Sequence, residues 1–329
     1  KARHASIRRR IEKSVGRQAE ARGQTPEDLV EIAVPTFGLS LPGILRRGIA
    51  GQEAELAITA TASATLRWNS PTGRVTMSVP KAVKEADPAA AKEISRLHRE
   101  IERTLPGQRD RLERLLLLGR TWSLADWRSR FADHPLLRHM VSRLIWQFEH
   151  SGTRVHGLIR DDKLVGIDGA PLKPLPGETR VALWHPITAA PELVGQWREQ
   201  LARLEVQQPF KQAHREVYVL TDAERATRVY SNRFAAHILR QHQMAELCKS
   251  RSWDYRLAGT SFDSGDSTPR REIPSAGLTA SFLVEPVADN DEHTSGISRY
   301  VATDQVWFES DRKSTRLNSS HITMSYAVF

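Results

Sequence analysis

Cysteine is almost missing from this sequence, because Cys248 is the single thiol among 329 residues. One thiol forms neither an intrachain disulfide framework nor a cysteine-based zinc cluster, which excludes the disulfide-rich secreted class and the zinc-finger class. This usage is typical of a reducing compartment, and we expect a cytoplasmic location. Cys248 continues an apolar register with Phe234, Ile238 and Ala245, which indicates a small buried hydrophobe rather than a nucleophile.

Long apolar runs are also absent, since the longest covers residues 115–118. A bilayer requires about 20 apolar residues, so we expect no membrane-spanning segment. A glycine-rich phosphate loop, a dinucleotide fingerprint, an HExxH helix and a cysteine pair with metal spacing are missing as well. The histidine pairs His134/His139 and His237/His242 are each five residues apart, which on a helix directs them to different faces. The sequence therefore predicts no metal and no cofactor, and it favours a protein that is not an enzyme.

The charge balance is basic. Lys and Arg number 48 against 39 Asp and Glu, for a formal net charge of +9. A basic surface attracts nucleic acid, but a solvated surface rich in Arg gives the same count. Charge alone therefore favours the solvated surface.

Both ends of the chain have unusual sequences. The chain opens at Lys1 without Met, inside an Arg-rich stretch, so we expect a fragment of a larger multidomain protein. Residues 311–321 read DRKSTRLNSSH, which matches the translation of a common sequencing adapter, and residues 325–329 continue it. We interpret residues 311–329 as a non-native tail. Without it the formal net charge is +7, because the tail carries three basic residues and one acidic residue.

The first half of the chain alternates helical and strand-like patterns. Thr25 and Pro26 are typical of a helix start, and residues 69–73 form a turn signal inside a β-hairpin or small meander over residues 54–79. Ser123 is a good N-cap for a short helix that runs through Trp127 and Phe131. The clearest amphipathic helix begins at residues 133–135 and extends to Phe148. Further helices are expected over residues 6–21, 89–103 and 108–118.

The second half continues this mixture. Strands are expected over residues 153–160, 164–168 and 180–184, and helices over residues 190–204, 211–219, 222–230 and 231–251. The fold class is therefore α+β, with a mainly helical core and small β-hairpins or sheets. We predict four segments: N-terminal helices with a hairpin (1–104), an α+β domain (105–262), a truncated β-rich segment (263–310) and the tail (311–329).

One group of polar residues, around Pro209, is a candidate binding site. A helix that begins at Pro209 would place Gln212, Arg215 and Glu216 on one face. Together with Gln208 and with His185 at a strand end, these residues could hold a phosphate or carboxylate, with Arg215 bidentate. The alternative is an internal hydrogen-bond network, and we favour it because buried polar groups must be paired.

The same region resembles a known family. The residues that carry the resemblance are Trp127, the His134-Pro135 helix with Trp146, His185-Pro186, Trp197, the run from Gln208 through Phe210 to Glu216, and Trp253. They resemble the domain of unknown function numbered 4132, found in bacterial proteins that include one named molybdate metabolism regulator. The resemblance covers about residues 105–260, with the usual upstream segment before it. It implies structural roles for Trp127, Pro135, Trp146, Trp197, Phe210 and Trp253. Where relatives read Arg-Gly-Trp this chain has Ser252 before Trp253, which departs from the pattern.

Two hypotheses of function remain open. The first is a non-catalytic regulatory or interaction protein whose partner is nucleic acid or another protein. The second is an enzyme or small-anion sensor that uses the pocket formed by His185, Gln212 and Arg215.

The adapter interpretation gives a direct prediction. If residues 311–329 are not native, removing them should leave the thermal unfolding midpoint within about 2 °C of the full chain, because they would contribute no core. Calorimetry of the two chains measures this. A midpoint lowered by several degrees would show that the tail is native sequence.

Overall fold

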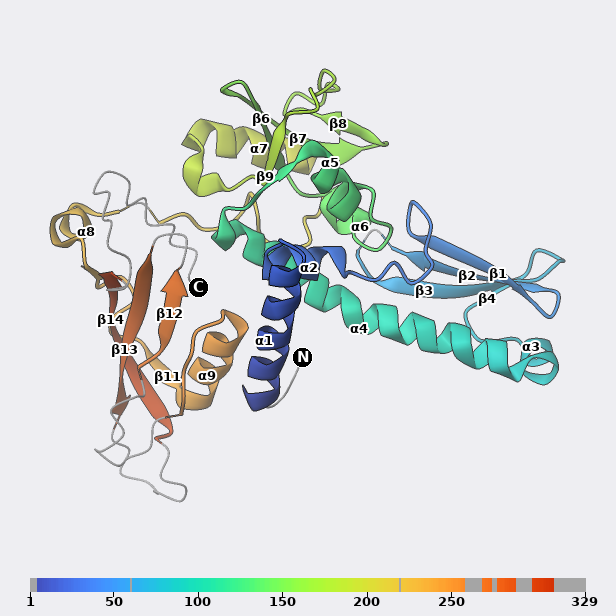
Figure 1. The fold of residues 1–329 in the computed structure, drawn as a ribbon, viewed down its shortest axis with the longest axis horizontal. Coiled ribbons are helices and arrows are strands. Elements are labelled where there is room, and N and C mark those ends of the chain that lie inside the picture. The colour runs from blue at the N-terminus through green and yellow to red at the C-terminus, as the bar shows by residue number, and fades with distance from the viewer. Residues whose placement is uncertain are drawn as a thin grey trace. The chain divides into compact units, whose positions relative to one another are not determined.

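The computed structural model describes residues 5–59, 61–218, 220–257, 268–273, 277–287 and 298–310 (Figure 1). The chain divides into two compact units, Lys1–Arg215 and Glu216–Phe329. Both contain helices and antiparallel sheets, so the α+β class is confirmed, whereas a mainly helical core is not. The predicted domain limits stay predictions, and residues 311–329 lie outside the described residues. Among the described residues, no helix combines the length and apolarity that a membrane crossing requires.

The first unit begins with α1 (Ala5–Ala21) and α2 (Pro26–Ile32), as the sequence predicts. A capping box defines the start of α2: the Thr25 hydroxyl accepts from the Asp28 N–H at 3.1 Å, and the Asp28 carboxylate accepts from the Thr25 N–H at 3.3 Å. Two otherwise unpaired donors are satisfied in this way, which fixes the helix boundary locally.

A four-stranded antiparallel meander follows. It consists of β1 (Ile44–Ile49), β2 (Gln52–Ile58), β3 (Ala64–Asn69) and β4 (Val75–Thr76) in that order. The predicted turn joins β3 to β4, with Gly73 at a φ of 81° that favours glycine. Alternate residues of β2 (Ala54, Leu56 and Ile58) are buried, so one sheet face belongs to the core.

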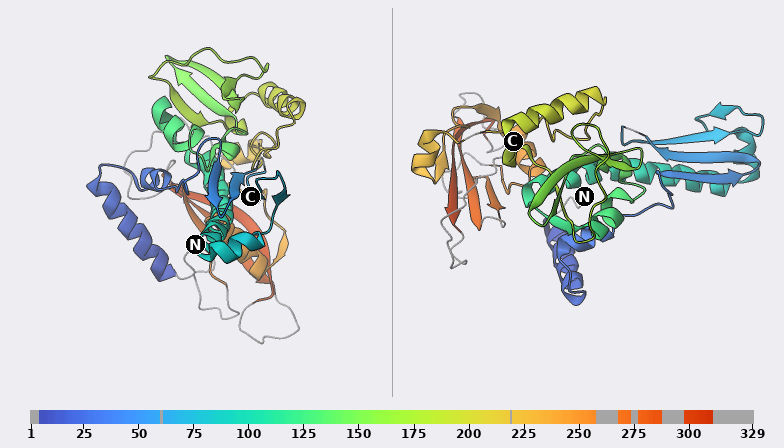
Figure 2. Two further views of the ribbon diagram at one scale, coloured as in Figure 1. Left: turned by 90° about the vertical axis from the view of Figure 1, so that its right-hand side faces the viewer. Right: turned by 90° about the horizontal axis from the view of Figure 1, so that it is seen from above.

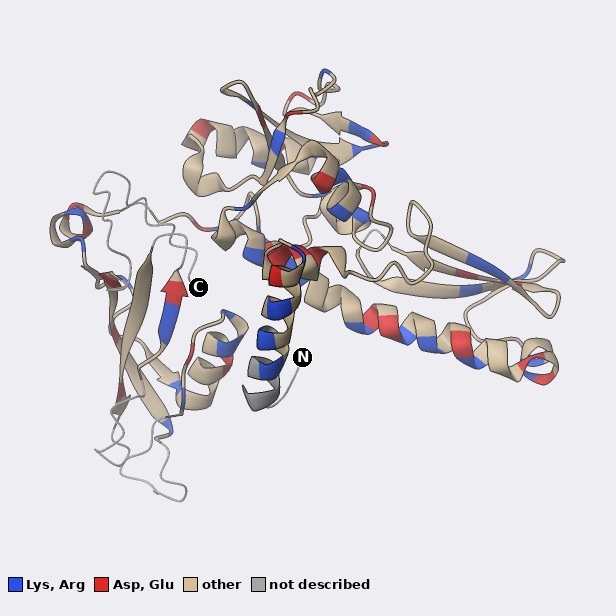
Figure 3. Ribbon diagram, viewed as in Figure 1, with Lys and Arg blue, Asp and Glu red and all other residues tan. Residues whose placement is uncertain are grey.

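The helix α4 (Pro88–Leu118) follows α3 (Lys81–Ala86) and lies along this sheet (Figure 2). It corrects the prediction of two helices over residues 89–103 and 108–118, because the helix continues through Pro106. Proline removes one helical hydrogen bond, but Ile101, Leu105 and Leu112 are buried on either side of it and hold the helix together. Basic and acidic residues are interleaved along its exposed surface (Figure 3). Gly119, in the left-handed region at φ 56°, ends the helix as expected.

The second sheet of this unit has the order β5-β9-β6-β7-β8 and is antiparallel throughout. Ser123 caps the short helix α5, as predicted. The π-helical turn η1 continues α5 toward α6, and the 3-10 turn η2 leads into α7. Their bounds are β5 (Thr121–Ser123), α5 (Leu124–Trp127), η1 (Arg128–Ala132), α6 (Arg138–Val141), β6 (Trp146–His150), β7 (Thr153–Arg160), β8 (Lys163–Val165), β9 (Arg180–Leu183), η2 (Pro186–Thr188) and α7 (Pro191–Arg203).

The long helix expected from residue 133 to Phe148 is wrong. Only Arg138–Val141 is α-helical, and Trp146–His150 forms the strand β6 between β7 and β9. The apolar residues are all buried as expected, but Leu144, Trp146 and Phe148 also alternate at the strand period. Both periods fit the same short run, and pairing with two neighbouring strands favours the strand.

An aromatic cluster forms the centre of the first unit. The ring of Trp146 lies 6.2 Å from that of Trp122, 5.5 Å from Trp127 and 5.7 Å from Phe131, in edge-to-face or tilted arrangements. Phe148 adds a further edge-to-face contact with Trp127 at 5.3 Å. Such pairs add about 0.5–1.5 kcal/mol each beyond the burial of their area. The cluster therefore fixes α5 and η1 against the sheet.

The second unit is built on another antiparallel sheet, of order β10-β14-β13-β12 with β11 also paired to β14. Met244 and Cys248 on α9 share an apolar core with Trp253 and Phe282. Cys248 is 4% exposed, and burial raises the pKa of its thiol to about 11, so it is a buried hydrophobe as predicted. The elements are α8 (Asp222–Thr227), β10 (Tyr230–Ser231), β11 (Ile238–Arg240), α9 (Gln241–Ser250), β12 (Arg270–Ile273), β13 (Leu278–Val287) and β14 (Tyr300–Ser310).

Two helices predicted for this unit are shorter than expected. The helix predicted over residues 222–230 ends at Thr227, where the following residue adopts a left-handed backbone. The helix predicted over residues 231–251 begins only at Gln241, because Ser231 and residues 238–240 pair with β14 instead. Sheet hydrogen bonds to a distant strand override the local helical pattern here.

A cluster of ion pairs attaches α2 to the rest of the first unit. Asp28 accepts from Arg130 at 2.5 Å and from Arg120 at 2.9 Å, while Glu31 accepts from the Trp122 indole at 2.9 Å. Burial alone would raise the pKa of Asp28, but hydrogen bonds from Thr25 and Arg130 hold it well below its usual range. The carboxylate is therefore stabilised in its charged form in the folded chain.

Asp28→Asn should lower the free energy of unfolding by about 1–2 kcal/mol at pH 7. A lowered pKa contributes stability above the unfolded value of about 3.9, and this contribution is lost as the pH falls below it. The difference from the parent chain should therefore shrink toward pH 2. Urea unfolding at both pH values measures it, with Glu93→Gln in the exposed Arg47–Glu93 pair as a control that should change little. An unchanged difference at low pH would contradict the electrostatic explanation.

Candidate functional site

The constellation expected from the sequence is not on a helix. Residues 207–218 form an irregular segment, so the helix predicted over residues 211–219 is wrong, and Gln212, Arg215 and Glu216 do not share a helical face. Phe210, Gln212 and Ala213 are buried, which anchors the segment by side chains rather than by helical hydrogen bonds.

Gln212 lies at the centre of a hydrogen-bond network. Its Nε2 donates to the carbonyls of Ile145 and Trp184, each at 2.8 Å. Its Oε1 accepts from the Ile145 N–H at 2.9 Å and from Gln208 Nε2 at 2.8 Å. A primary amide has two donors and two acceptor positions, so Gln212 is fully used. A ligand would have to displace one of these bonds to reach it.

Gln208 extends this network. Its Oε1 accepts from the Ala213 N–H at 2.9 Å, and its Nε2 also approaches the Arg143 carbonyl at 3.3 Å. The two glutamines thus hold residues 208–213 against the end of β6. This arrangement is the internal network that we favoured as the alternative, although a ligand role for these side chains stays a prediction.

His185 and Arg215 lie beside this network. Arg215 donates from Nη2 to Glu113 on α4 at 2.6 Å, and His185 Nδ1 accepts from the Ile187 N–H at 3.0 Å. Burial, and then the charge of Arg215, lowers the pKa of His185 to about 4, so the imidazole is neutral at pH 7. Arg215 Nε and His185 Nε2 have no hydrogen-bond partner within the described part of the chain. Glu216 is exposed and begins the second unit.

The aromatic residues of the family resemblance are core residues. Trp127, Trp146 and Trp197 are fully buried, Phe210 and Trp253 are buried, and Pro135 is half-buried. Their indole and phenyl faces are therefore covered by protein. In the residues that the structure describes, no group of three or more His, Cys, Asp or Glu side chains is arranged to hold a metal ion.

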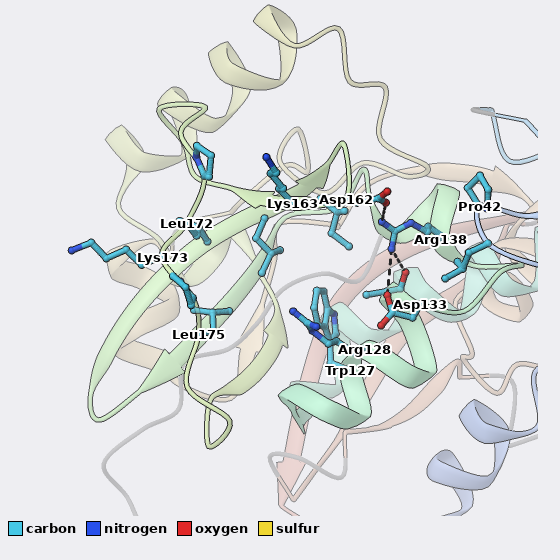
Figure 4. Close-up of a pocket in the computed structure, with 16 residues that line it drawn as sticks. Pro42, Trp127, Arg128, Asp133, Arg138, Asp162, Lys163, Leu172, Lys173 and Leu175 are labelled. Carbon is cyan, nitrogen blue, oxygen red and sulfur yellow. Dashed lines mark hydrogen bonds and ion pairs between the residues drawn. The ribbon is translucent and has the colours of Figure 1, made fainter.

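A cleft of about 570 Å³ lies elsewhere in the first unit, away from the residues that the sequence singled out as a site (Figure 4). One wall is formed by Trp127, Arg128 and Asp133 of the α5–η1 region together with Arg138 of α6. The facing wall comes from the β7–β8 turn and from the proline-rich loop after β8. Its remaining lining residues are Leu41, Pro42, Ala132, Ile159, Asp162, Lys163, Leu164, Pro171, Leu172, Lys173, Pro174 and Leu175.

The charges of the cleft fall into two groups. Arg138 is paired with Asp133 at 3.5 Å and with Asp162, and it also donates to the Ala132 carbonyl at 2.5 Å. Arg128, Lys163 and Lys173 form no ion pair with any described residue. The cleft therefore combines apolar lining residues with three cations that form no ion pair with a described residue.

This cleft was missed because its parts are distant in the sequence. Residues 41–42, 127–138 and 159–175 come together only through the sheet and the aromatic cluster. The proline-rich loop at residues 169–177, with Lys173 at its centre, is the one local signal that could have indicated it.

Gln212→Glu tests the glutamine network. The carboxylate would lose the Nε2 donors and face the carbonyls of Ile145 and Trp184, so the free energy of unfolding should fall by about 2–4 kcal/mol at pH 7. Protonation should restore part of this loss near pH 4, since burial raises the pKa of a carboxyl. Urea unfolding measures both effects, with exposed Gln207→Glu as the matched control. A loss no larger than that of the control would rule out a structural role for Gln212.

Comparison with known proteins is consistent with these features. Residues 73–253 match the family described as "Domain of unknown function (DUF4132)". The chain is similar to the uncharacterized protein YehI of Escherichia coli (strain K12), at 26% identity over 215 residues. That alignment covers 63% of this chain and 18% of YehI, so the chain spans less than a fifth of that relative's length. No solved structure matches the chain. Because the family match covers more than half of the sequence and includes both the glutamine network and the cleft wall from Trp127 to Lys173, the chain belongs to the DUF4132 family.

Proposed function

We propose that this chain is a non-catalytic interaction module that binds an anionic partner in the cleft of its first unit. The observation that carries the proposal is the set of three cations, Arg128, Lys163 and Lys173, beside apolar lining residues. Uncompensated cations beside apolar surface favour a ligand that brings both carboxylates or phosphates and apolar groups. The proposed setting is the cytoplasm, which agrees with a single buried cysteine.

The distribution of charge supports this location. Lys and Arg exceed Asp and Glu by 35 to 24 over residues 1–215, whereas acids exceed bases by 14 to 10 over residues 216–310. The basic balance of the chain therefore resides in the first unit. Much of it lies on helices where acids neutralise it, as in the Arg96–Glu100 pair of α4. The cleft cations differ in their setting, because they form no ion pair with a described residue and also stand beside apolar lining residues.

The composition of the cleft supports binding rather than catalysis. Its described lining contains no His, Cys, Ser, Thr or Tyr, and its two carboxylates, Asp133 and Asp162, are both engaged by Arg138. The residue types that most often supply a nucleophile or a proton-transfer group, other than the amines of Lys163 and Lys173, are therefore missing from the described lining or already ion-paired. The alternative function, an enzyme or anion sensor at His185 and Arg215, would have to use a buried neutral imidazole and an arginine already paired with Glu113.

Replacing Arg128, Lys163 and Lys173 together by Gln tests the proposal. Each partly exposed charge contact contributes roughly 0.5 kcal/mol, so affinity for a fluorescent polyglutamate 20-mer should fall about tenfold. Fluorescence anisotropy at low and high salt measures this, and parent binding should weaken as salt rises. The free energy of unfolding should stay within about 1 kcal/mol of the parent value.

The matched control replaces three exposed cations away from the cleft, Lys84, Lys92 and Arg103, by Gln. This variant carries the same change in net charge but leaves the cleft intact. Equal loss of affinity in both variants would show that general charge, and not the cleft, is responsible, and the proposal would then fail.

A further inference from the structure

The apolar residues of the cleft indicate the chemistry of its partner. This inference rests on the proposed binding function. Leu41 lies at its margin with 48% of its surface exposed, next to Pro42. The lining also includes Leu172 and Leu175 of the proline-rich loop (Figure 4), which are partly buried. Exposed leucine beside concave apolar surface is stabilised when a ligand side chain removes it from water. A ligand with charged groups alone would leave this apolar surface exposed to water.

The cations are placed on separate elements. Arg128 belongs to η1, Lys163 to β8 and Lys173 to the loop after β8. In Figure 4, Arg128 lies beside Trp127 on the helical wall, while Lys163 and Lys173 lie on the facing wall. Because three different elements carry the cations, a ligand with several anionic groups can pair with each of them.

Nucleic acid fits this surface less well than a polypeptide. Trp127 is the one aromatic side chain in the described lining, and at 1% exposure its ring offers no face on which a base could stack. Asp162 and Asp133 are also exposed in the cleft, with 88% and 50% of their side chains accessible. Although both pair with Arg138, they repel any polyanion, and a peptide whose acids are spaced by apolar residues brings fewer charges near them than a backbone with a charge at every nucleotide.

We infer that the partner is a segment of another protein in which acidic residues are interspersed with large apolar residues. Its carboxylates pair with Arg128, Lys163 and Lys173, and an apolar side chain covers Leu41 and the loop leucines. This is the chemistry by which grooves recognise short peptide segments, where apolar anchors supply affinity and charges set orientation.

Leu41→Ser separates this inference from the proposed function, because it removes apolar surface and leaves every cleft charge in place. The probes are a soluble 12-residue peptide of mixed Glu and Leu, polyglutamate of equal charge, and an oligothymidylate. Leu41→Ser should weaken the mixed peptide about fivefold and leave polyglutamate unchanged. Leu41→Met should retain binding. The control is Ile32→Ser on α2, which removes an equally exposed apolar side chain (49%) outside the cleft.

The outcomes are distinct. Weaker binding of the mixed peptide alone, with oligothymidylate binding less tightly than that peptide, supports the inference. If Leu41→Ser affects neither acidic probe while the triple Gln variant weakens both, the proposed anion-binding function stands and the inference is overturned. If oligothymidylate binds as tightly as the mixed peptide and loses affinity in the triple variant, the partner is nucleic acid and the inference is overturned. Self-association in sedimentation velocity that disappears in the triple variant would identify a second copy as the partner, which also overturns it.

Discussion

The burial of Trp146 is the constraint on which the first unit depends. Its ring holds Trp122, Trp127 and Phe131 together, while its backbone pairs with Gly157 of β7 and Leu183 of β9. The residue before it, Ile145, supplies two of the three backbone groups that Gln212 binds, and Trp184 supplies the third. One position therefore couples the aromatic cluster, the sheet and the glutamine network. The cleft follows from the same arrangement, since Trp127 lies in one wall and the β7–β8 turn lies in the facing wall.

The glutamine network and the cleft differ in whether their polar groups are paired within the protein. Around Gln212 every amide atom is paired within the protein, and such a saturated network specifies one backbone arrangement. In the cleft, Arg138 pairs with both carboxylates, and Arg128, Lys163 and Lys173 are exposed to solvent. Cations exposed to water destabilise the free chain little. They contribute binding energy only when the anionic groups of a partner replace that water. The contrast between a saturated and an unsaturated region separates a structural element from a candidate binding site more clearly than residue type does.

What the sequence could predict depended on the range of the interactions involved. The helix start at Thr25 and Pro26, the N-cap at Ser123 and the helix end at residue 118 are local, and the structure has all three where the sequence predicts them. Burial around residues 136–148 was also predictable, but the strand was not, because its partners lie in β7 and β9. The irregular segment after Pro209 depends on a side chain bonding to a distant strand, which a helical pattern cannot reveal. The cleft could not be predicted either, because three stretches that are distant in the sequence form it.

The continuity of α4 has a consequence for cooperativity. With 31 residues it extends about 46 Å, at 1.5 Å per residue. It crosses the predicted boundary between the segments 1–104 and 105–262 without a break. Its buried residues belong to one apolar cluster that also contains Leu56 and Trp68 of the first sheet and Trp146 and Val181 of the second. Part of the second sheet packs against α7 in a separate cluster with Leu158 and Val165, but Trp146 and Val181 share their core with α4 and the first sheet. The amide hydrogens of both sheets should therefore exchange with solvent through the same opening event, as a single unit of local stability rather than two.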